Sequence, residues 1–374
     1  MEPIRILHEN VIMDLGGIET QLMRIYRIID RSKVQFDFLV HRAEQGAYDS
    51  EIRALGGKIH YAEPFNPFRH AQYITSMKKI FREHPEYKIM LAHSELALHP
   101  LKTAKEAGIP VRICYSHNGQ LMVDLKRLFI EYEKLFLKTC CTKMFAVSES
   151  AARYTYGDKA VNEGKVRIIR NGIIIEDFVF DRQKRTAKRK ELGLEGKFIV
   201  GHVGRFMKQK NHDFLLEVFK CLSDSEKDAH LLLVGEGRLE NRIRQSAKKL
   251  GIEEKTTFLG NRIDVPDLMK AMDVFVLPSL WEGFPNVAIE AQASSLPLFL
   301  SKNITAEAAF SKHAKRLPLA LGAESWAKII RESTRGDNER EDMSRFMSEQ
   351  GFDVRETARW YQKFYMDTFQ NIKG

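Results

Sequence analysis

Residues 197–222, KFIVGHVGRFMKQKNHDFLLEVFKCL, decide the fold, because a short apolar run is followed directly by an amphipathic one. The first ten residues are typical of a buried strand, and residues 212–222 carry apolar side chains at helical spacing. The same order returns in AHLLLVGEG and RLENRIRQSAKKLG, residues 229–251. Strands that alternate with helices in this way predict a parallel sheet with helices on its faces.

The first half of the chain has the same alternation, with a predicted strand at 4–13 and a helix at 18–29. A basic stretch from Arg182 to Lys197 interrupts it, where we expect a connecting segment and a solvated helix. We therefore predict an α/β protein of two doubly wound, Rossmann-like domains, 1–178 and 179–353, that face a central cleft. Residues 354–374 are expected to form a helix that packs back on the N-terminal domain, because its aromatic residues recur at helical spacing.

Composition narrows the function only loosely. The 374 residues, 44% of them apolar, are enough for two cores, and 59 Lys and Arg against 50 Asp and Glu give a net charge of +9. Such an excess attracts phosphates, anionic lipids or nucleic acid without choosing among them. The four cysteines form no CxxC pair and no secretory leader is recognisable, so we expect a cytoplasmic protein. The apolar runs are too short to cross a bilayer, which leaves peripheral membrane contact.

Doubly wound sheets bind ligands beyond the carboxyl ends of their strands, so the loops there hold the candidate residues. Gly16 and Gly17 precede the first helix, and they either let a ligand approach the backbone or form a tight turn. Arg205 and Lys210, five apart, suit a diphosphate, although basic residues are often only a solvated surface. His117 ends the strand VRICYS, where it either contacts a ligand or has a structural role.

Two carboxylates flank a turn in LPSLWEGFPNVAIEAQA, residues 277–293. Gly283 and Pro285 exclude a regular helix at the start, so Glu282 is expected in the loop and Glu290 in the helix that follows. A bare phosphate would be repelled by two carboxylates, so if both are functional they should face hydroxyl groups. The alternative is a surface glutamate beside a helix dipole.

Taken in order, LGGIET, YSHN, RNGI, VGHVGRFMKQKNH, LLLVGEGRLE, FLGNRIDV and LPSLWEGFPNVAIEAQA resemble the retaining GT-B nucleotide-sugar glycosyltransferases of family 4. The resemblance is strongest to the branch that builds bacterial exopolysaccharide and capsule. It covers nearly the whole chain, is weakest from about residue 302 onward, and rests most specifically on the glutamate pair.

The resemblance implies a role for each matched residue. Arg205 and Lys210 match the cations that hold the donor diphosphate, and Glu290 matches the carboxylate that binds the ribose hydroxyls. Glu282 and His117 match residues beside the transferred sugar, so His117, Glu282, Arg205 and Lys210 are the expected catalytic residues. Further donor-binding positions implied are Gly16, Gly17, Gly235, Asn261, Arg262, Ile263, Gly283, Phe284, Asn286 and Val287. The chain departs from the family pattern at Leu15, Tyr115 and Ser295, where a polar residue, a second histidine and a glycine are usual.

The resemblance thus implies a retaining hexosyltransferase that moves a sugar, UDP-linked, to a glycan or polyprenyl-linked acceptor. No DxD sequence is present, so we expect neither a metal nor another cofactor, with the leaving-group charge met by Arg205, Lys210 and backbone dipoles. The basic and apolar segment 125–143 either contacts an anionic membrane or forms an ordinary packed helix. Two alternatives stay open: a GT-B epimerase or hydrolase of nucleotide sugars, and a nucleic-acid-binding protein, for which no module or zinc spacing is present.

Overall fold

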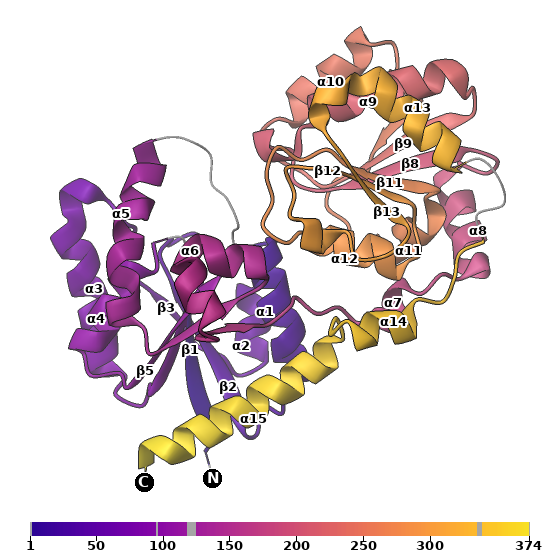
Figure 1. Cartoon of the computed structure of the whole chain (residues 1–374). Coiled ribbons are helices and arrows are strands. Elements are labelled where there is room, and N and C mark those ends of the chain that lie inside the picture. The colour runs from indigo at the N-terminus through magenta and orange to yellow at the C-terminus, as the bar shows by residue number, and fades with distance from the viewer. Residues whose placement is uncertain (1, 95, 118–124, 335–338, 374) are drawn as a thin grey trace. The chain divides into compact units, whose positions relative to one another are not determined.

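A computed structural model describes residues 2–94, 96–117, 125–334 and 339–373, without the side chains of 125–130 and 373. The chain forms two compact units: unit 1 comprises Met1–Gly172 and Asp353–Gly374, and unit 2 comprises Ile173–Phe352. Each unit is a parallel sheet between layers of helices, as Figure 1 shows. The predicted fold class, two Rossmann-like α/β domains, is confirmed. The observed division falls at Gly172, whereas the sequence suggested residue 178.

Unit 1 is built on a seven-stranded sheet with the order β3-β2-β1-β4-β5-β6-β7, in which every pair is parallel. Its strands are β1 Ile4–Asn10, β2 Val34–Val40, β3 Ile59–Tyr61, β4 Ile89–Ala92, β5 Val111–Ser116, β6 Lys143–Ala146 and β7 Val166–Ile168. Its helices are α1 Gly17–Ile28, α2 Asp49–Ala54, α3 His70–Glu83, α4 Leu98–Glu106, α5 Leu125–Cys140, α6 Glu149–Asn162 and α15 Val354–Lys373.

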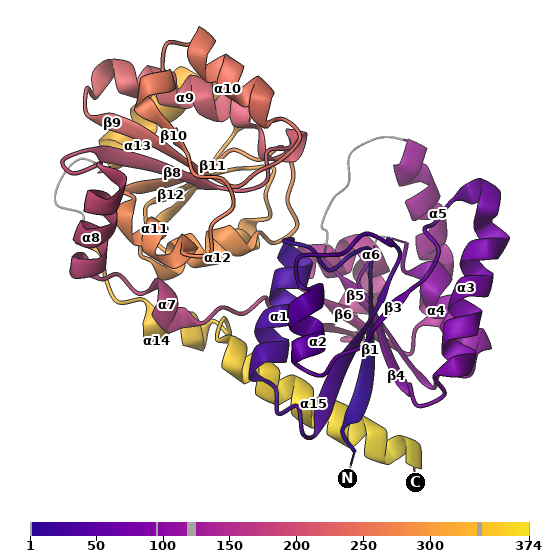
Figure 2. The ribbon, with the colours of Figure 1, turned by 180° about the vertical axis from the view of Figure 1, so that it is seen from behind.

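Both faces of this sheet are buried, so its strands are apolar on both sides. On one face Leu7 and Met90 pack with Tyr73 and Met77 of α3. On the other, Phe36 contacts Tyr26 of α1 and Tyr365 of α15. The C-terminal helix α15 therefore completes the core of unit 1, and Figure 2 shows it running beside α1 and the strands β1 and β2.

Unit 2 has a six-stranded sheet with the order β10-β9-β8-β11-β12-β13, again all parallel. Its strands are β8 Phe198–Val203, β9 Ala229–Val234, β10 Thr256–Phe258, β11 Val274–Leu277, β12 Leu298–Ser301 and β13 Ala314–Leu317. Its helices are α7 Ile175–Phe178, α8 Arg182–Leu192, α9 His212–Ser225, α10 Glu240–Lys249, α11 Val265–Ala271, α12 Asn286–Ala293, α13 Gly322–Thr334 and α14 Ser344–Glu349. Phe219 of α9, Ile243 of α10 and Trp326 of α13 fill the core over one face of the sheet.

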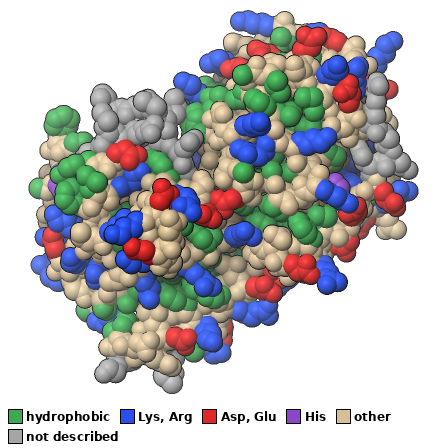
Figure 3. All heavy atoms as spheres, in the orientation of Figure 1, with side chains coloured by type: hydrophobic (Ala, Val, Ile, Leu, Met, Phe, Trp, Pro, Cys, Tyr) green, Lys and Arg blue, Asp and Glu red, His purple; other side chains and the backbone are tan. Residues whose placement is uncertain are grey.

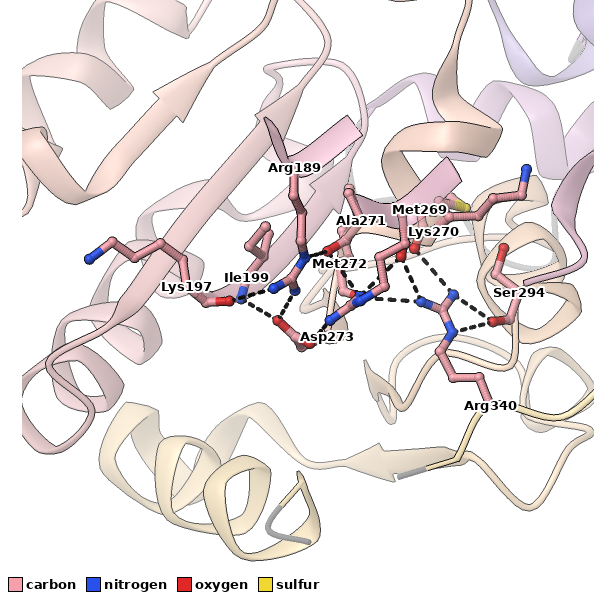
Figure 4. Close-up of polar contacts among 11 residues, drawn as sticks. Arg189, Lys197, Ile199, Met269, Lys270, Ala271, Met272, Asp273, Ser294 and Arg340 are labelled. Atoms are coloured by element: carbon pink, nitrogen blue, oxygen red, sulfur yellow. Dashed lines mark hydrogen bonds and ion pairs between the residues drawn. The ribbon is translucent and has the colours of Figure 1, made fainter. Parts of the chain in front are cut away.

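The basic stretch after residue 182 is a helix, α8, but it is more than the solvated helix expected from the sequence. Arg185 and Arg189 each bind the carboxylate of Asp273 at 2.5 Å, and Asp273 also accepts the Ile199 backbone N–H. Both guanidinium groups further donate to carbonyl groups at the C-terminal end of α11. Figure 4 shows Arg189 between Asp273 and the Ala271 carbonyl group. The half-buried Arg340 donates to carbonyls of the same helix end and of Ser294. These contacts satisfy helix-end carbonyl groups that otherwise lack partners.

The described residues include no helix both long and apolar enough to cross a bilayer. On the face seen in Figure 3, Lys and Arg side chains are interspersed with Asp and Glu and form no continuous basic stripe.

Candidate functional site

The strand order of unit 2 locates its candidate site. From the central pair β8 and β11, the chain proceeds to β9 on one side and to β12 on the other. At such a switch point the two following loops diverge and leave a crevice at the carboxyl ends of the strands. The loop after β8 carries Arg205 and Lys210, and the loop after β11 carries Glu282. The candidate residues of two separate motifs therefore lie in loops that follow adjacent strands.

Lys210 and Glu282 form an ion pair at this switch point. Lys210 Nζ lies 2.6 Å from Glu282 Oε1, and the two side chains are 13% and 10% exposed. Ser279 Oγ donates to the same oxygen at 2.9 Å, and Gln209 Nε2 donates to Oε2 at 3.2 Å. Glu282 is thus held in one orientation by three donors from two loops. An ammonium group has three N–H donors, so Lys210 can hold Glu282 and still bind an anionic ligand.

Close backbone packing explains the glycines around this pair. A Cβ on Gly204 would lie 3.0 Å from Lys210 Cε, and one on Gly235 would lie 2.3 Å from the Gly204 carbonyl oxygen. Gly235 also has a φ of +128°, which side chains rarely adopt. The predicted donor-binding role of Gly235 stays a prediction, and packing of the two loops is by itself a reason for glycine. Arg205, in the same loop, is exposed.

The glutamate pair lies in the elements that the sequence predicted. Glu282 is in the loop, and Glu290 is buried in α12, which begins at Asn286 after Pro285 as its N-cap. Gly283 and Phe284 lie in the bend before the helix, where Phe284 is buried against Phe352. Val287 is in the first turn. Backbone N–H groups of a helix N-terminus favour anions, so this turn has the polarity that a phosphate requires.

The predicted donor-binding residues 261–263 have polar contacts of their own. Asn261 donates from its amide to Glu236 Oε2 at 3.1 Å, and Arg262 forms an ion pair with Asp264 at 2.6 Å. Ile263 is fully exposed. The structure brings these residues near the loop after β9 through the antiparallel bridge between Gly235 and Gly260.

Unit 1 has its own switch point between β1 and β4, and a chain of three histidines lies there. His8 Nδ1 of β1 is 3.0 Å from His93 Nε2 after β4, and His93 Nδ1 is 3.0 Å from His117 Nε2 after β5. Burial lowers the pKa of His8 and of His117 to about 3, and that of His93 well below its usual value. All three rings are therefore neutral near pH 7. Asn118 and Gly119, in the motif that suggested His117, lie outside the described residues.

His8 and His93 were missed by the motif search, although the sequence holds a signal for one of them. His93 ends the strand KIMLAHS just as His117 ends VRICYS, and these strands are neighbours in the sheet. A pocket lies beside them, lined in part by His93, His117, Tyr115, Glu133 and Thr155. Tyr115, which stands where the family often has histidine, donates its hydroxyl to the Ile169 carbonyl oxygen at 2.8 Å.

Gly16 and Gly17 lie at the N-terminus of α1, which follows the loop after β1. Gly16 is the N-cap, and its carbonyl oxygen accepts the Thr20 N–H at 2.9 Å. Within the described residues, no group of three or more His, Cys, Asp or Glu side chains is arranged to hold a metal ion. The predicted independence of metal remains to be tested by experiment.

The two parallel-sheet units have the architecture of the GT-B glycosyltransferases, and comparison with known proteins places the chain in that class. The model of the family Glycosyltransferase Family 4 matches residues 15–177, and that of Glycosyl transferases group 1 matches residues 184–349. The putative glycosyltransferase EpsF of Bacillus subtilis is 34% identical over 363 residues, 95% of this chain and 94% of that protein. The chain therefore belongs to the group 1 and family 4 glycosyltransferases, and it is a transferase.

A relative from Escherichia coli, a UDP-Gal:alpha-D-GlcNAc-diphosphoundecaprenol alpha-1,3-galactosyltransferase, is 27% identical over 80% of this chain and 79% of that protein. Among solved structures, Anabaena HepE in complex with UDP and glucose matches with a TM-score of 0.79 at 19% identity, over 96% of this chain and 99% of that one. The glycosyltransferase WaaG matches with a TM-score of 0.69 at 16% identity, over 96% and 95% of the two chains. At these identities the structures support the fold alone.

Proposed function

We propose that this glycosyltransferase moves a hexose from a UDP-sugar to a lipid-linked glycan, with retention, in the synthesis of an exopolysaccharide or capsule. The observation that carries the proposal is the Lys210–Glu282 ion pair at the switch point of unit 2, beside the N-terminus of α12. A fixed cation and helix N–H groups suit a diphosphate, and a fixed carboxylate suits sugar hydroxyls. That combination matches a nucleotide-sugar donor.

The proposed division of roles follows from these positions. Arg205 and Lys210 stabilise the negative charge that develops on the diphosphate as the bond to the sugar breaks. Glu282 orients the transferred sugar, and Glu290 accepts hydrogen bonds from the ribose hydroxyls. His117 in unit 1 donates a hydrogen bond to the donor sugar. Departure of the diphosphate then requires no metal, because protein cations and backbone N–H groups meet its charge.

The relatives support the choice of donor and acceptor. The Escherichia coli relative is named for transfer from UDP-Gal to a GlcNAc-diphosphoundecaprenol, and HepE was crystallised with UDP-glucose. A capsular polysaccharide glycosyltransferase of Staphylococcus aureus, CapM, is 32% identical over about half of the chain. Association with an anionic membrane follows for a lipid-linked acceptor, and exposed Tyr132, Leu135 and Phe136 on α5 offer apolar contacts for it.

The first test is a thermal-shift screen of nucleotide sugars, because a ligand that binds the folded chain stabilises it by mass action. We expect UDP-sugars to raise the melting temperature more than GDP- or ADP-sugars do. The preferred donor is then incubated with and without a polyprenyl-diphosphate-linked glycan. Sugar transfer supports the proposal, whereas acceptor-independent turnover at the same rate indicates an epimerase or hydrolase. Anionic liposomes that fail to pellet the protein would exclude the membrane contact.

The independence of metal has its own measurement. We expect the transfer rate to be unchanged in EDTA, because Lys210, Arg205 and backbone N–H groups supply the charge that a metal would otherwise supply. Loss of turnover in EDTA and its return with Mn²⁺ would show that these cations do not suffice.

A further inference from the structure

The direction of the hydrogen bonds along the histidine chain can be worked out from the number of protons. Each of the three neutral rings carries one N–H, and each of the two ring-to-ring contacts needs one donor and one acceptor. His93, in the middle, uses both nitrogens and is satisfied in either direction. Only two arrangements are therefore open: either all three protons are on Nδ1, or all three are on Nε2.

The surroundings of His8 distinguish the two arrangements. His8 is 1% exposed, and its Nε2 atom is buried without a hydrogen-bond partner. Its ring packs against Phe36 and Phe38, with centroids 4.3 and 5.8 Å away. With protons on Nε2, His8 would bury an N–H among aromatic rings, whereas with protons on Nδ1 it buries only a lone pair. Orphaned buried N–H groups are rarer in proteins than acceptors with unused lone pairs.

We propose that His8 and His93 are positioning residues that hold His117 as the tautomer with its proton on Nδ1. Because Nε2 of His117 is occupied by His93, Nδ1 is the nitrogen left for a ligand, and the described residues provide it with no recorded partner. His117 then meets its ligand as a hydrogen-bond donor and not as a base. The ligand group it selects is an acceptor, such as a sugar hydroxyl or ring oxygen.

This inference deepens the proposed function, because it specifies what His117 offers to the donor sugar. Burial keeps all three rings neutral, as their lowered pKa values indicate, so the chain is not disturbed near pH 7. The chain also spans β1, β4 and β5, so the orientation of His117 is tied to the central strands of the sheet. A hydrogen bond to the far nitrogen of a histidine ring fixes both the tautomer and the angle of that ring.

The direct test is nitrogen NMR of the full chain with labelled histidine, which reads the protonated nitrogen of each ring without any turnover. The variants His8→Asn, His93→Asn and His117→Asn assign the signals by removing one ring each. We expect His8, His93 and His117 all to carry the proton on Nδ1 at pH 7. A proton on Nε2 of His117 would overturn the inference.

A kinetic test compares asparagine with leucine at positions 8 and 93. His8 and His93 each use Nδ1 for the contact with the next ring towards His117. The side-chain amide of asparagine can supply an N–H donor in place of Nδ1, whereas leucine has a similar size and no donor. We expect His93→Leu to lower kcat for sugar transfer by about tenfold or more, with the donor KM changed far less, and His93→Asn to recover most of the rate. The same order is expected for His8→Leu and His8→Asn.

A matched control is His60→Gln. His60 is a partly buried histidine of the same sheet, and burial lowers its pKa to about 4. It contacts Tyr87 and is not one of the three linked histidines. Equal rates for the asparagine and leucine variants, at equal melting temperatures, would refute the positioning role. If His117→Asn transfers sugar normally while NMR finds the proton on Nδ1, the tautomer stands and the role proposed for His117 in transfer fails. If His93→Leu does not fold, the comparison of His8→Leu with His8→Asn still tests the positioning role, and the wild-type NMR spectrum still tests the tautomer.

Discussion

At the scale of single residues, Lys210 has two roles, one in holding Glu282 and one in the proposed reaction. Lys210 holds a carboxylate that is only 10% exposed, and it is proposed to stabilise the departing diphosphate. Removing the Lys210 ammonium group therefore leaves the negative charge on the departing diphosphate less stabilised, and it leaves Glu282 without its cation. Arg205, which is exposed on the same loop, is proposed to share the second role.

We expect Lys210→Met and Arg205→Ala each to slow transfer on the order of a hundredfold, the cost of losing a donor that acts in the transition state. Lys210→Met should also lower the melting temperature, because Glu282 loses its cation. Lys208→Met is the control, because Lys208 lies in the same short 3-10 helix, Lys208–Lys210, and is exposed. Rates near wild type in both variants would contradict the assignment of the cations.

Ser295 shows what a departure from the family pattern does to the backbone. It follows α12 with a φ of +51°, and the N–H groups of Ser295 and Leu296 bond back to Gln292 and Ala291, as in a Schellman motif. Glycine is the usual residue there, since other side chains are strained in the left-handed region. Ser295 Oγ accepts the Glu341 N–H at 3.1 Å, which offsets part of that strain.

Two substitutions at Ser295 distinguish the strain from the bond. Ser295→Ala keeps the strain and loses the acceptor, so we expect it to reduce the free energy of unfolding by about 1 kcal/mol. Ser295→Gly loses the acceptor but relieves the strain, so it should be more stable than Ser295→Ala by a similar amount. Urea unfolding of both variants measures the difference, and equal stabilities would indicate an unstrained serine.

At the scale of elements, α8 is joined to the sheet by charge, since none of its residues is fully buried. Asp273 receives Arg185, Arg189 and the Ile199 N–H, so it links α8 to the start of β8. We expect Asp273→Asn to lower the free energy of unfolding by about 2–3 kcal/mol, because two partly buried cations lose their counterion. The matched control is Asp228→Asn, whose exposed pair with Lys197 should contribute less than about 1 kcal/mol. Similar losses in both variants would mean that α8 does not depend on this carboxylate.

Which of these elements could be predicted depends on how local their causes are. Glu282 in a loop and Glu290 in a helix followed from Gly283 and Pro285 between them, because those residues break a helix wherever they occur. The contact of Lys210 with Glu282 could not be predicted from spacing, since it depends on β8 pairing with β11, which only the folded sheet determines.

The role of α8 was missed for a similar reason. Its basic residues are typical of a solvated helix. Their partner, Asp273, lies more than 80 residues away in the sequence, so local sequence does not indicate the contact. The histidine chain was missed because each ring occurs alone, within or directly after its own strand. Only the pairing of β1, β4 and β5 brings the three rings together.

At the scale of the whole molecule, buried histidines make the folded state sensitive to acid. Burial lowers the pKa values of His8 and His117 to about 3, of His60 and His202 to about 4, of His212 to about 2, and that of His93 well below 6.5. Below pH 6.5 the unfolded chain binds protons that the folded chain does not. Stability is therefore full above pH 6.5 and is lost as the pH falls towards 4.

We expect the free energy of unfolding to decrease between pH 6.5 and 4 by up to about 1.4 kcal/mol per pH unit for each such histidine. Urea unfolding at several pH values measures the slope. His60→Gln, which removes one of these groups away from the proposed site, should make the slope shallower. A stability that stays constant from pH 6.5 to 5 would mean that these rings are protonated in the folded chain.

The return of α15 to unit 1 has a consequence for how the protein is made. Both ends of unit 2 meet in one hydrogen bond, from the Ile173 N–H to the Phe352 carbonyl oxygen at 2.8 Å, so unit 2 is inserted within unit 1. Domains usually complete folding in the order of their synthesis. Here the unit that emerges first lacks Tyr361 and Tyr365 of its own core until α15 has been synthesised. Unit 1 is thus finished only after unit 2, and a chain released after residue 352 contains all of unit 2 but leaves unit 1 with an open apolar face.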